Sequence, residues 1–460
     1  MTPIFDAVVI GSGVNGLVAA AQLAKSGWSV ALIEGSDRLG GFIATEERTL
    51  PPTSPCCRGS STTPTHWAGI LGGEPRSPRV LRHVVKLLRR ERFSGAEEWL
   101  RATMTSGRSY CRGAFRGDEP DVLWIPWLLH AGLSPDHALG GLTLPVMAAT
   151  LHGFGMPVVA GGAQNFVRAF EALLDELGLH VSTGQSAERL LLTAGRVMGV
   201  ATDGETIRAR HAVLVSVTPT ALYGELLPQD APVPPAIRDE ALRFRYGRAA
   251  MQLHVALSAP LGWRDARLAG IPLVHLSDGS ASTAIACAEA EAGLLPRRPT
   301  LVVGQQYVLD PSRVPDGAAT LWTQLQELPY KPTGDAAGEL DAHGHWTKEL
   351  TEGYVQRVLA RIALHAPDLP EKLLAWDAVT PSDLMAHNRN AVNGDPYGGS
   401  TELDQALLWR PLPGAARHAT PVPGLWHIGA STHPGPGLGA GSGHLVAQHL
   451  IRGRRRSSRR

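Results

Sequence analysis

Three glycines near the start of the chain have the type and spacing that could bind a phosphate group. Gly11, Gly13 and Gly16 form a G-x-G-x-x-G pattern, and Glu34 follows further along the chain. Glycines at this spacing permit a tight turn, let the backbone approach a pyrophosphate and let a helix pack closely against a strand. A carboxylate at the position of Glu34 accepts hydrogen bonds from a ribose 2′-hydroxyl and repels a 2′-phosphate, so the pattern disfavours NADP.

The segments around these glycines have the composition of the elements that would position them. Residues 5–10 and 29–33 are apolar runs typical of buried parallel strands, and residues 17–26 are typical of an alanine-rich helix. Such a βαβ unit presents the unpaired N–H groups of its helix to a phosphate. We therefore predict dinucleotide binding rather than a glycine-rich turn in another kind of α/β protein. The residues predicted to contact the dinucleotide are Gly11, Ser12, Gly13, Asn15, Gly16 and Glu34.

Residues 38–41, Arg-Leu-Gly-Gly, come shortly after the second predicted strand. With this continuation the sequence resembles the flavoprotein superfamily of phytoene desaturases and amine oxidases. The resemblance implies that the cofactor is FAD, with Arg38, Gly40 and Gly41 around the far side of its pyrophosphate and ribityl chain. It also implies an α/β fold: a Rossmann-like FAD-binding domain of the glutathione reductase type 2 class, with an inserted α+β substrate domain.

A second glycine-rich segment lies near the other end of the chain. Residues 424–430 are typical of a short buried strand, residues 431–443 of a glycine-rich loop, and residues 444–451 of a helix. A helix start of this kind offers backbone N–H groups that could stabilise the negative charge on the N1–C2=O edge of a reduced flavin. The segment resembles the closing FAD motif of phytoene desaturase-like oxidoreductases. The resemblance implies cofactor contacts at Gly429, Ala430, Gly437, Gly439 and Ala440.

The same loop contains His433, the candidate that the sequence offers for a catalytic side chain. Its ring could hold the loop by packing or by a hydrogen bond to the backbone, or it could transfer a proton; we favour the structural role. No cysteine follows Cys287, so the sequence has no counterpart of the C-terminal thioether that tethers flavin in some amine oxidases. We therefore predict that FAD is bound noncovalently.

The middle of the chain continues the pattern of a nucleotide-binding sheet. Residues 164–177 keep the apolar spacing of a helix. Short strands are predicted at residues 180–182, 189–193, 196–202, 206–209 and 212–217, with a hairpin turn at Asp203-Gly204. The resemblance implies that the backbone near Ala187 contacts the adenine and that residues 216–218 lie where the chain returns to the nucleotide.

Residues 115–132 and 393–411 are similar to one branch of the phytoene desaturase-related oxidoreductases, whose human relatives carry a pyridine nucleotide-disulfide name. Their aromatic side chains could line an apolar pocket over the flavin or belong to the ordinary core. The candidates for this substrate pocket are Trp124, Trp127, Tyr397 and Trp409. We expect Arg116, Asp118 and Arg410 to form structural ion pairs rather than catalytic ones.

These segments divide the chain into two domains. The FAD-binding domain is predicted to comprise residues 1–50, 155–225 and 415–452, and the substrate-binding, partly helical domain residues 75–154 and 226–414. Residues 51–74 are rich in proline, serine and threonine and are predicted to be a loop or disordered, whereas residues 80–99 resume helical spacing. Residues 453–460 form a basic tail, which we expect to be disordered rather than to bind anionic lipid.

Composition and charge exclude several function classes. The 460-residue chain carries a net charge of +1, which argues against a dedicated nucleic-acid-binding protein. Its four cysteines form no CxxC pair and no zinc-finger spacing, so we expect no metal site and no disulfide framework, in a reducing, cytoplasmic compartment. We expect neither a secretory signal nor a membrane-spanning segment. The basic face of the helix predicted at residues 80–99 could make peripheral contact with an anionic membrane surface, although we favour a solvated helix.

The resemblance implies the chemistry of an FAD-dependent oxidoreductase, in which the cofactor carries the redox step and the protein supplies orientation and electrostatics. We expect hydride transfer from a small apolar organic substrate, a polyene or isoprenoid-like molecule, to flavin N5, with oxygen or quinone as the electron acceptor. A flavin amine oxidase is the alternative enzyme class, although only Lys331 and Lys348 lie where its lysine would be expected. An FAD-binding protein without turnover is the third alternative, because the unusual segment at residues 51–74 could damage the substrate pocket.

Overall fold

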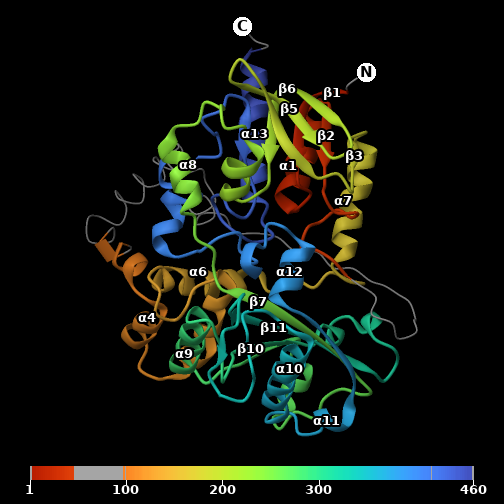
Figure 1. Cartoon of the computed structure of the whole chain (residues 1–460). Helices are drawn as coiled ribbons and strands as arrows, with labels where there is room; N and C mark the ends of the chain where they lie inside the picture. Colours follow the sequence, from red (N-terminus) through yellow and green to blue (C-terminus); the bar gives the residue numbers. More distant parts are fainter. Residues whose placement is uncertain (1–2, 46–96, 99, 416, 458–460) are drawn as a thin grey trace.

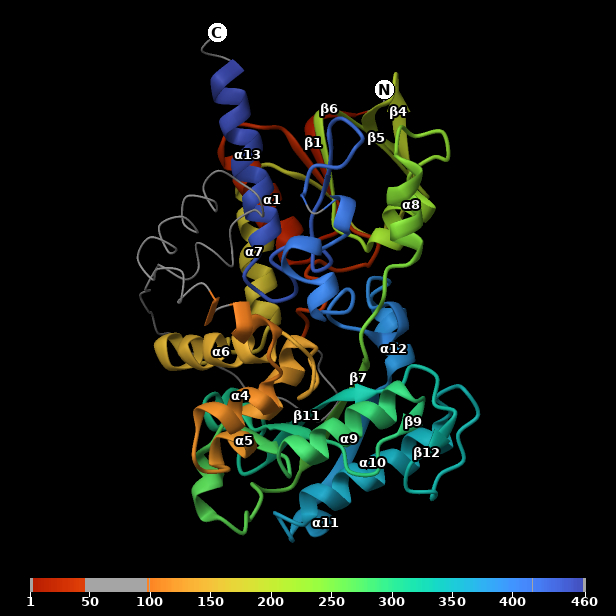
Figure 2. The same cartoon turned by 90° about the vertical axis from the view of Figure 1, so that its left-hand side faces the viewer.

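The computed structural model of the chain describes residues 3–45, 97–98, 100–415 and 417–457, and these form two bodies, each built around one sheet (Figure 1). The two ends of the chain meet in the upper body, and a five-stranded sheet lies in the lower body (Figure 2). The predicted loop at residues 51–74 lies outside the described residues, as does most of the helix predicted at residues 80–99.

The upper sheet begins with the predicted βαβ unit. It consists of β1 (Ile4–Ile10), α1 (Val14–Lys25) and β2 (Val30–Ile33). β1 and β2 pair in parallel, with Ala7 opposite Val30. Helices cover both faces of the sheet at this point, so the strands bury side chains on both faces and read as continuous apolar runs.

The complete upper sheet has the strand order β3-β2-β1-β6-β5-β4, and a seventh strand, β14, lies beside β6. Four of these strands lie within the predicted segments, except that β4 begins two residues earlier than predicted. They are β3 (His180–Ser182), β4 (Ala187–Thr193), β5 (Arg196–Thr202) and β14 (Leu425–His427). β6 (Thr206–Val215) is one continuous strand, so the prediction of two strands separated at residues 210–211 is wrong.

The reason lies in the partners of β6. Along one edge the strand changes partner, because Arg208 pairs with Gly199 of β5 whereas Val213 pairs with Leu425 of β14. The exposed polar pair Arg210-His211 lies between these two contacts. On the other edge β1 pairs with β6 from Arg208 to Val215, with a register shift at the same place, between Ala209 and Ala212.

Helices cover both faces of the upper sheet. α1, α7 (Gln164–Glu176) and α13 (Gly441–Ser457) pack into the core on one face. α8 (Pro235–Leu242) and the π-helical turn at Ala221–Leu226 pack into the core on the other face. That second core also contains Phe244 and Leu412, so residues well beyond 225 contribute to the upper body. Figure 2 shows α13 alongside α1.

α13 extends further than the sequence predicted. The helix continues to Ser457, so the expectation of a disordered tail is wrong for residues 453–457. The Arg454 guanidinium lies 5.3 Å from the ring centroid of Trp28, donates to the Gly27 carbonyl O at 3.2 Å and lies 3.7 Å from the Asp6 carboxylate. These contacts attach the basic end of α13 to the first βαβ unit.

The lower body is built on an antiparallel sheet. In order across the sheet, its strands are β13 (Leu373–Val379), β7 (Ala249–Leu257), β11 (Ala319–Leu328), β10 (Leu301–Gly304) and β8 (Leu273–Leu276). Alternate residues of β7 and β11 are buried in a core that α10 (Lys348–Ala363) covers. Because side chains alternate between the two faces, the residues between them lie on the opposite, half-buried face.

Helices and short turns surround this sheet and connect it to the upper body. α4 (Gly107–Ala114), α5 (Glu119–Trp124), the 3-10 segment η1 (Ile125–Ala131) and α6 (Gly140–Phe154) share a small core of their own. The remaining elements are α9 (Ser280–Glu291), α11 (Leu369–Lys372), α12 (Pro381–His387) and the paired strands β9 (Leu294–Leu295) and β12 (Gly334–Asp335). α12 lies between the two bodies and contacts β7 (Figure 1).

Two kinds of feature are absent from the part of the chain that the structure describes. No helix there is long and apolar enough to cross a membrane. Those residues also contain no group of three or more His, Cys, Asp or Glu side chains that could hold a metal ion. The two described cysteines, Cys111 and Cys287, are free thiols in buried positions.

Candidate functional site

The turn between β1 and α1 has the geometry that its glycines predict. Gly11 adopts a φ of +91°, and a Cβ atom there would lie 3.2 Å from Ser216, the residue after β6. A Cβ atom at Gly16 would collide with the carbonyl O of Gly11, which sets how closely α1 approaches the strand. Gly13 faces open space, and no described side chain caps the N-terminus of α1. The first N–H groups of the helix are therefore available to an anion beside Gly13.

Ser12 and Glu34 hold this turn in place. The backbone N–H and the hydroxyl of Ser12 both donate to Glu34 Oε2 at 2.7 Å, and the Ser36 N–H donates to Glu34 Oε1 at 2.9 Å. The Gly40 N–H donates to Ser12 Oγ at 3.1 Å. Ser12 is fully buried, so it orders the loop from behind. Glu34 lies at the carboxyl end of β2, where the ribose of a dinucleotide binds in such folds.

The segment before β4 runs alongside the end of β2. The Gln185 N–H donates to the Glu34 carbonyl O at 2.9 Å, and the Gly184 N–H donates to the Ser36 carbonyl O at 2.7 Å. Ala187, the first residue of β4, follows directly. The structure therefore places the Ala187 backbone close to the ribose end of the site, and its contact with adenine stays a prediction.

The two glycine-rich segments meet at Asn15. Ser442 Oγ donates to Asn15 Oδ1 at 2.8 Å and accepts from the Gly429 N–H at 2.9 Å. The Gly443 N–H donates to Asn15 Oδ1 at 3.3 Å, and a Cβ atom at Gly443 would collide with the Asn15 carbonyl O. Sequence reasoning missed Ser442 and Gly443, although glycines at the start of a helix are a signal for close approach of two backbones.

Open space lies along both glycine-rich loops. A Cβ atom at Gly13, Gly437 or Gly439 would meet no described atom within 4 Å, and Gly437 adopts a φ of +127°, which favours glycine. Gly429 and Ala440 also adopt positive φ, at +101° and +51°. Exposed backbone on two joined loops, with an acid at the end of β2, suits a cofactor with two phosphates and a ribose. The residues present therefore fit FAD.

Residues 38–41 close over the first turn. A Cβ atom at Gly41 would lie 3.4 Å from Gly13 Cα, and His387 Nε2 lies 3.3 Å from the Gly41 carbonyl O. The end of α12 therefore touches the predicted cofactor loop. The Arg38 side chain is 62% exposed and lies 3.9 Å from the Asp37 carboxylate, so its contact with a pyrophosphate stays a prediction.

Arg410 supports the second loop from the interior. It is 2% exposed, and its guanidinium donates to the carbonyl O atoms of Ser400, Tyr397 and Ala430 at 2.9–3.2 Å. Burial lowers the pKa of Arg410 to about 10, so the group is still charged at neutral pH. Hydrogen bonds to backbone carbonyls, one of them in the cofactor loop, thus take the place of the predicted ion pair.

Asp395 shapes the same region and was missed by sequence reasoning. Its buried carboxylate accepts hydrogen bonds from the N–H groups of Gly247, Tyr397 and Gly399 at 2.7–2.9 Å. Burial raises the pKa of Asp395, and these N–H groups and the nearby Arg410 act against that shift. The available signal was an aspartate beside a glycine-rich turn, because aspartate side chains bind backbone N–H groups there.

His433 lies inside the second loop and is 5% exposed. Its carbonyl O accepts a hydrogen bond from His418 Nε2 at 2.8 Å, so a neighbouring buried side chain fixes the backbone of His433. This contact involves the backbone of His433 and not its ring, so the loop-holding role and proton transfer by the ring both stay predictions.

The predicted pocket aromatics lie in two places. The ring centroids of Trp124 and Trp127 are 6.5 Å apart, and the Tyr397 hydroxyl donates to the carbonyl O of Leu129, which lies in η1 as Trp127 does, at 2.6 Å. Trp409 is 39% exposed in a separate turn. The structure thus brings Trp124, Trp127 and Tyr397 together around η1 and leaves Trp409 apart.

Trp127 packs against a pair of histidines whose pairing the sequence did not reveal. The centroids of Trp127 and His275 are 4.7 Å apart, and His130 Nε2 lies 2.9 Å from His275 Nε2. Burial lowers the pKa of His130 to about 4, and burial together with His130 lowers that of His275 to about 3. Both rings are neutral at neutral pH, so this wall of the lower body is aromatic and uncharged.

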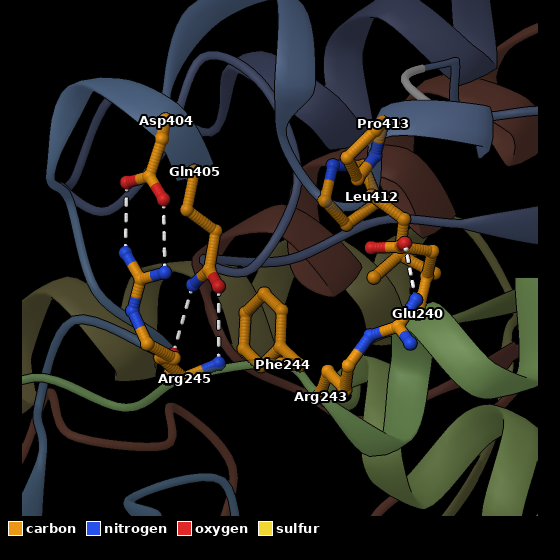
Figure 3. A pocket seen from close by; sticks show the side chains of 9 residues that line it. Glu240, Arg243, Phe244, Arg245, Asp404, Gln405, Leu412 and Pro413 are labelled. Carbon is orange, nitrogen blue, oxygen red and sulfur yellow. Dashed lines mark hydrogen bonds and ion pairs between the residues drawn. The ribbon is translucent and has the colours of Figure 1, made fainter.

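A separate pocket of about 300 Å³ lies between α8 and residues 404–413 (Figure 3). The Arg245 guanidinium forms a two-point ion pair with Asp404 at 2.7 and 2.8 Å, and Gln405 binds the backbone of Arg245. None of the predicted site residues lines this pocket. We therefore regard its polar groups as structural.

Acid is expected to destabilise the protein through its buried histidines. Burial lowers the pKa of His130 and His427 to about 4 and that of His275 to about 3, from 6.5. Below pH 6.5 the unfolded chain binds protons that the folded chain does not, so stability is full above pH 6.5 and falls as the pH drops toward 4. Each group contributes about 1.4 kcal/mol per pH unit. Glu327, whose pKa burial raises to about 7, opposes one of the three, so we expect a net loss of stability as the pH falls toward 4.

Thermal unfolding followed between pH 7.5 and pH 5 measures this effect. The melting temperature should fall steadily below pH 6.5, and a His130→Gln/His275→Gln variant should lose most of the dependence. An equal melting temperature at pH 7.5 and pH 5 would show that the buried histidines do not destabilise the protein in acid. The same pH dependence of the melting temperature in the double variant and the wild type would show that His130 and His275 do not cause it.

The geometry above defines the class of protein. Glycine-rich loops at the ends of two parallel strands, joined through Asn15 and flanked by Glu34, have the arrangement that a Rossmann-type, FAD-dependent oxidoreductase uses for its cofactor. A family model described as flavin containing amine oxidoreductase matches residues 63–437, and one described as NAD(P)-binding Rossmann-like domain matches residues 9–69. The first match covers most of the chain, which therefore belongs to the flavin-containing amine oxidoreductase family.

Curated relatives and solved structures are similar to the chain over nearly its whole length. Pyridine nucleotide-disulfide oxidoreductase domain-containing protein 2 of Rattus norvegicus is 26% identical, with 98% of this chain and 94% of that protein covered. Hydroxyneurosporene desaturase of Cereibacter sphaeroides is 24% identical, with 96% and 97% covered. A triple mutant of putrescine oxidase matches with a TM-score of 0.57 at 16% identity, over 98% of this chain and 100% of that one, which shows a shared fold. The predicted resemblance, fold class and cofactor are thus confirmed.

Proposed function

We propose that this FAD-dependent oxidoreductase desaturates a largely apolar, isoprenoid-like substrate. Relatives named hydroxyneurosporene desaturase and zeta-carotene-forming phytoene desaturase support this substrate class. The observation that carries the proposal is the aromatic, uncharged wall of Trp127, His130 and His275 beside the half-buried face of the lower sheet. Such a wall stabilises the apolar chain of a substrate by burying its surface, and it offers no charged group that would bind a charged substrate.

Bound FAD supplies the acceptor for a hydride. The start of α1 would hold the phosphates through its N–H groups, and Glu34 would orient the ribose. Arg410 holds the Ala430 carbonyl and so fixes the loop that would face the flavin ring. The Tyr397 hydroxyl donates to Leu129 and burial raises its pKa, so Tyr397 fills space and excludes water rather than transferring a proton.

The positions of the described lysines favour desaturation over amine oxidation. Lys25 ends α1, Lys331 is exposed in the loop after β11, and the Lys348 side chain is 83% exposed. The Lys372 ammonium lies 2.6 Å from the Asp368 carboxylate. None of these four lies on the half-buried face of the lower sheet.

Anaerobic mixing of the FAD-loaded protein with matched substrates tests the proposal. An isoprenoid polyene should bleach the flavin absorbance, and primary amines should not. Bleaching by amines alone would instead establish amine oxidation, and bleaching by neither across a broad panel would establish a protein that binds FAD without turnover. Readmission of oxygen or of a quinone to the reduced protein then identifies the electron acceptor, for which we propose one of these two.

A further inference from the structure

The face of the lower sheet opposite α10 is lined by half-buried polar and aromatic side chains. They alternate along β7 and β11 with the residues of the core. The set comprises Gln252, His254, Thr320, Trp322 and Gln324, with His275 on β8. Figure 2 shows β7 and β11 with α10 on one side and the upper body with α6 and α12 on the other, so this face is turned toward the upper body.

The strand register places two carboxamides side by side on this face. Gln324 of β11 is directly opposite Gln252 of β7, and Val302 of β10 joins Gln324 to His275 of β8. Opposite residues of antiparallel strands share a face, with Cβ atoms about 5 Å apart. The two glutamines therefore lie in the middle of a row that ends at the Trp127–His130–His275 wall.

This row lies close to the cofactor loop. Gln326, two residues after Gln324, donates through Nε2 to the Tyr397 hydroxyl at 2.8 Å. The next residue along the chain from Tyr397 is Gly398, where a Cβ atom would lie 3.1 Å from Ala430 Cβ. The row is therefore connected to the loop of Ala430 through Gln326 and Tyr397.

The two amides have hydrogen-bonding capacity that the described residues do not use. The Gln324 amide makes no hydrogen bond to another described residue. Gln252 accepts only one, from Trp322 Nε1 to its Oε1 at 3.4 Å. A half-buried carboxamide favours a partner for its two donors and its acceptor, and water or a ligand must supply it.

The chemistry of the row favours a neutral partner. A carboxamide both donates and accepts and carries no charge, so it matches a hydroxyl or a carbonyl. A ligand with a carboxylate would instead favour an arginine side chain in the protein, and a ligand with an ammonium group would favour a carboxylate side chain. The row from His275 to Val379 contains no charged side chain, and Asp377 lies in the adjacent row, exposed on the edge strand opposite His254.

We propose that Gln252 and Gln324 bind a hydroxyl or carbonyl group of the substrate and thereby determine its specificity. This inference rests on the proposed function and narrows it, because it excludes a pure hydrocarbon as the preferred substrate. The substrate would be an apolar chain with one neutral polar group, held by the two amides while the chain packs on the aromatic wall.

Three probes with one polyene skeleton test the proposal: all-trans-retinol, the hydrocarbon with a methyl group in place of its CH2OH, and retinylamine. Binding to the FAD-loaded protein is measured by quenching of tryptophan fluorescence and by the shift of the flavin spectrum. The wild type should bind the alcohol about tenfold more tightly than the hydrocarbon, the discrimination expected of one hydrogen bond. Gln324→Leu and Gln252→Leu should reduce that ratio to about one.

Two further variants keep the test interpretable. Thr323→Val changes the same strand on its other face, where Thr323 is fully buried, and should keep the wild-type ratio. Gln324→Glu keeps the size of the side chain but adds a charge, and it should shift the preference toward the amine. Flavin content of each variant checks that the fold is intact.

Failure of the inference differs from failure of the proposed function. Equal binding of alcohol and hydrocarbon by the wild type, no binding of the alcohol, or an unchanged ratio in both leucine variants would overturn the inference, even where a polyene still bleaches the flavin. A preference for the alcohol that the leucine variants abolish, without bleaching of the flavin by any polyene, would support the inference and contradict the proposed desaturase function.

Discussion

Replacing Gly443 by alanine is expected to destabilise the protein and to weaken FAD binding, because the added methyl group would collide with the carbonyl O of Asn15. Gly443 lies at the start of α13, and Asn15 lies in the first turn of α1, so the clash is between two helix backbones at the cofactor turn. Overpacking of this kind costs about 1–3 kcal/mol, and the upper end applies because backbone cannot rotate aside as a side chain can. A loss of about 2–3 kcal/mol in binding free energy weakens FAD affinity about 30- to 140-fold.

Gly453 provides the matched control, because it lies in the same helix and a Cβ atom there would meet no described atom within 4 Å. Alanine is more favourable than glycine in a helix by about 1 kcal/mol, so Gly453→Ala should keep or raise the melting temperature. Thermal unfolding and flavin content of the two variants are compared. Equal behaviour of Gly443→Ala and Gly453→Ala would show that α13 does not press on the cofactor turn.

Replacing Arg410 by methionine is expected to be the most damaging change outside the glycine-rich loops. Methionine fills a similar volume but leaves the buried carbonyl O atoms of Tyr397 and Ala430 without their donor, and it leaves that of Ser400 with Gln405 Nε2 alone, at 3.3 Å. Each unsatisfied buried carbonyl costs about 1–3 kcal/mol, so the total loss should reach about 3–5 kcal/mol. Release of the Ala430 carbonyl also loosens the second loop, so we expect the purified variant to contain little flavin.

Arg245→Met separates this effect from the loss of any arginine in the region. The Arg245 side chain is 49% exposed, and its ion pair with Asp404 at the surface pocket is of the kind that contributes less than about 1 kcal/mol (Figure 3). Urea unfolding and the ratio of flavin to protein are measured for both variants. If Arg410→Met retains the stability and flavin of Arg245→Met, the buried guanidinium does not hold the loop.

The parts of the fold that local patterns determine could be predicted from the sequence. The β1–α1–β2 unit follows from two apolar runs, an alanine-rich helix and glycines at fixed spacing, all within one short stretch of chain. The strand, loop and helix around residues 424–451 follow from the same kind of pattern. Each of these elements is set by residues that are neighbours in sequence, so periodicity and turn chemistry suffice.

The features that sequence reasoning missed depend on partners far away in the chain. Asn15 meets Gly443 only because α13 packs on α1, and His130 meets His275 only because η1 lies against the edge of the lower sheet. The continuous β6 depends on β14 taking over an edge from β5, which no local pattern near Arg210 reveals. The helical end of α13 depends likewise on Trp28 and Asp6, which bind Arg454.

The central claim is that the two glycine-rich loops form one noncovalent FAD site, and the absorption spectrum of the purified protein tests it most directly. After incubation with FAD and removal of the excess, we predict flavin bands near about 370 and about 450 nm, one flavin per chain, and full release of the flavin by acid precipitation. Protein that carries no flavin band after this treatment, or flavin that stays with the acid precipitate, would contradict the claim.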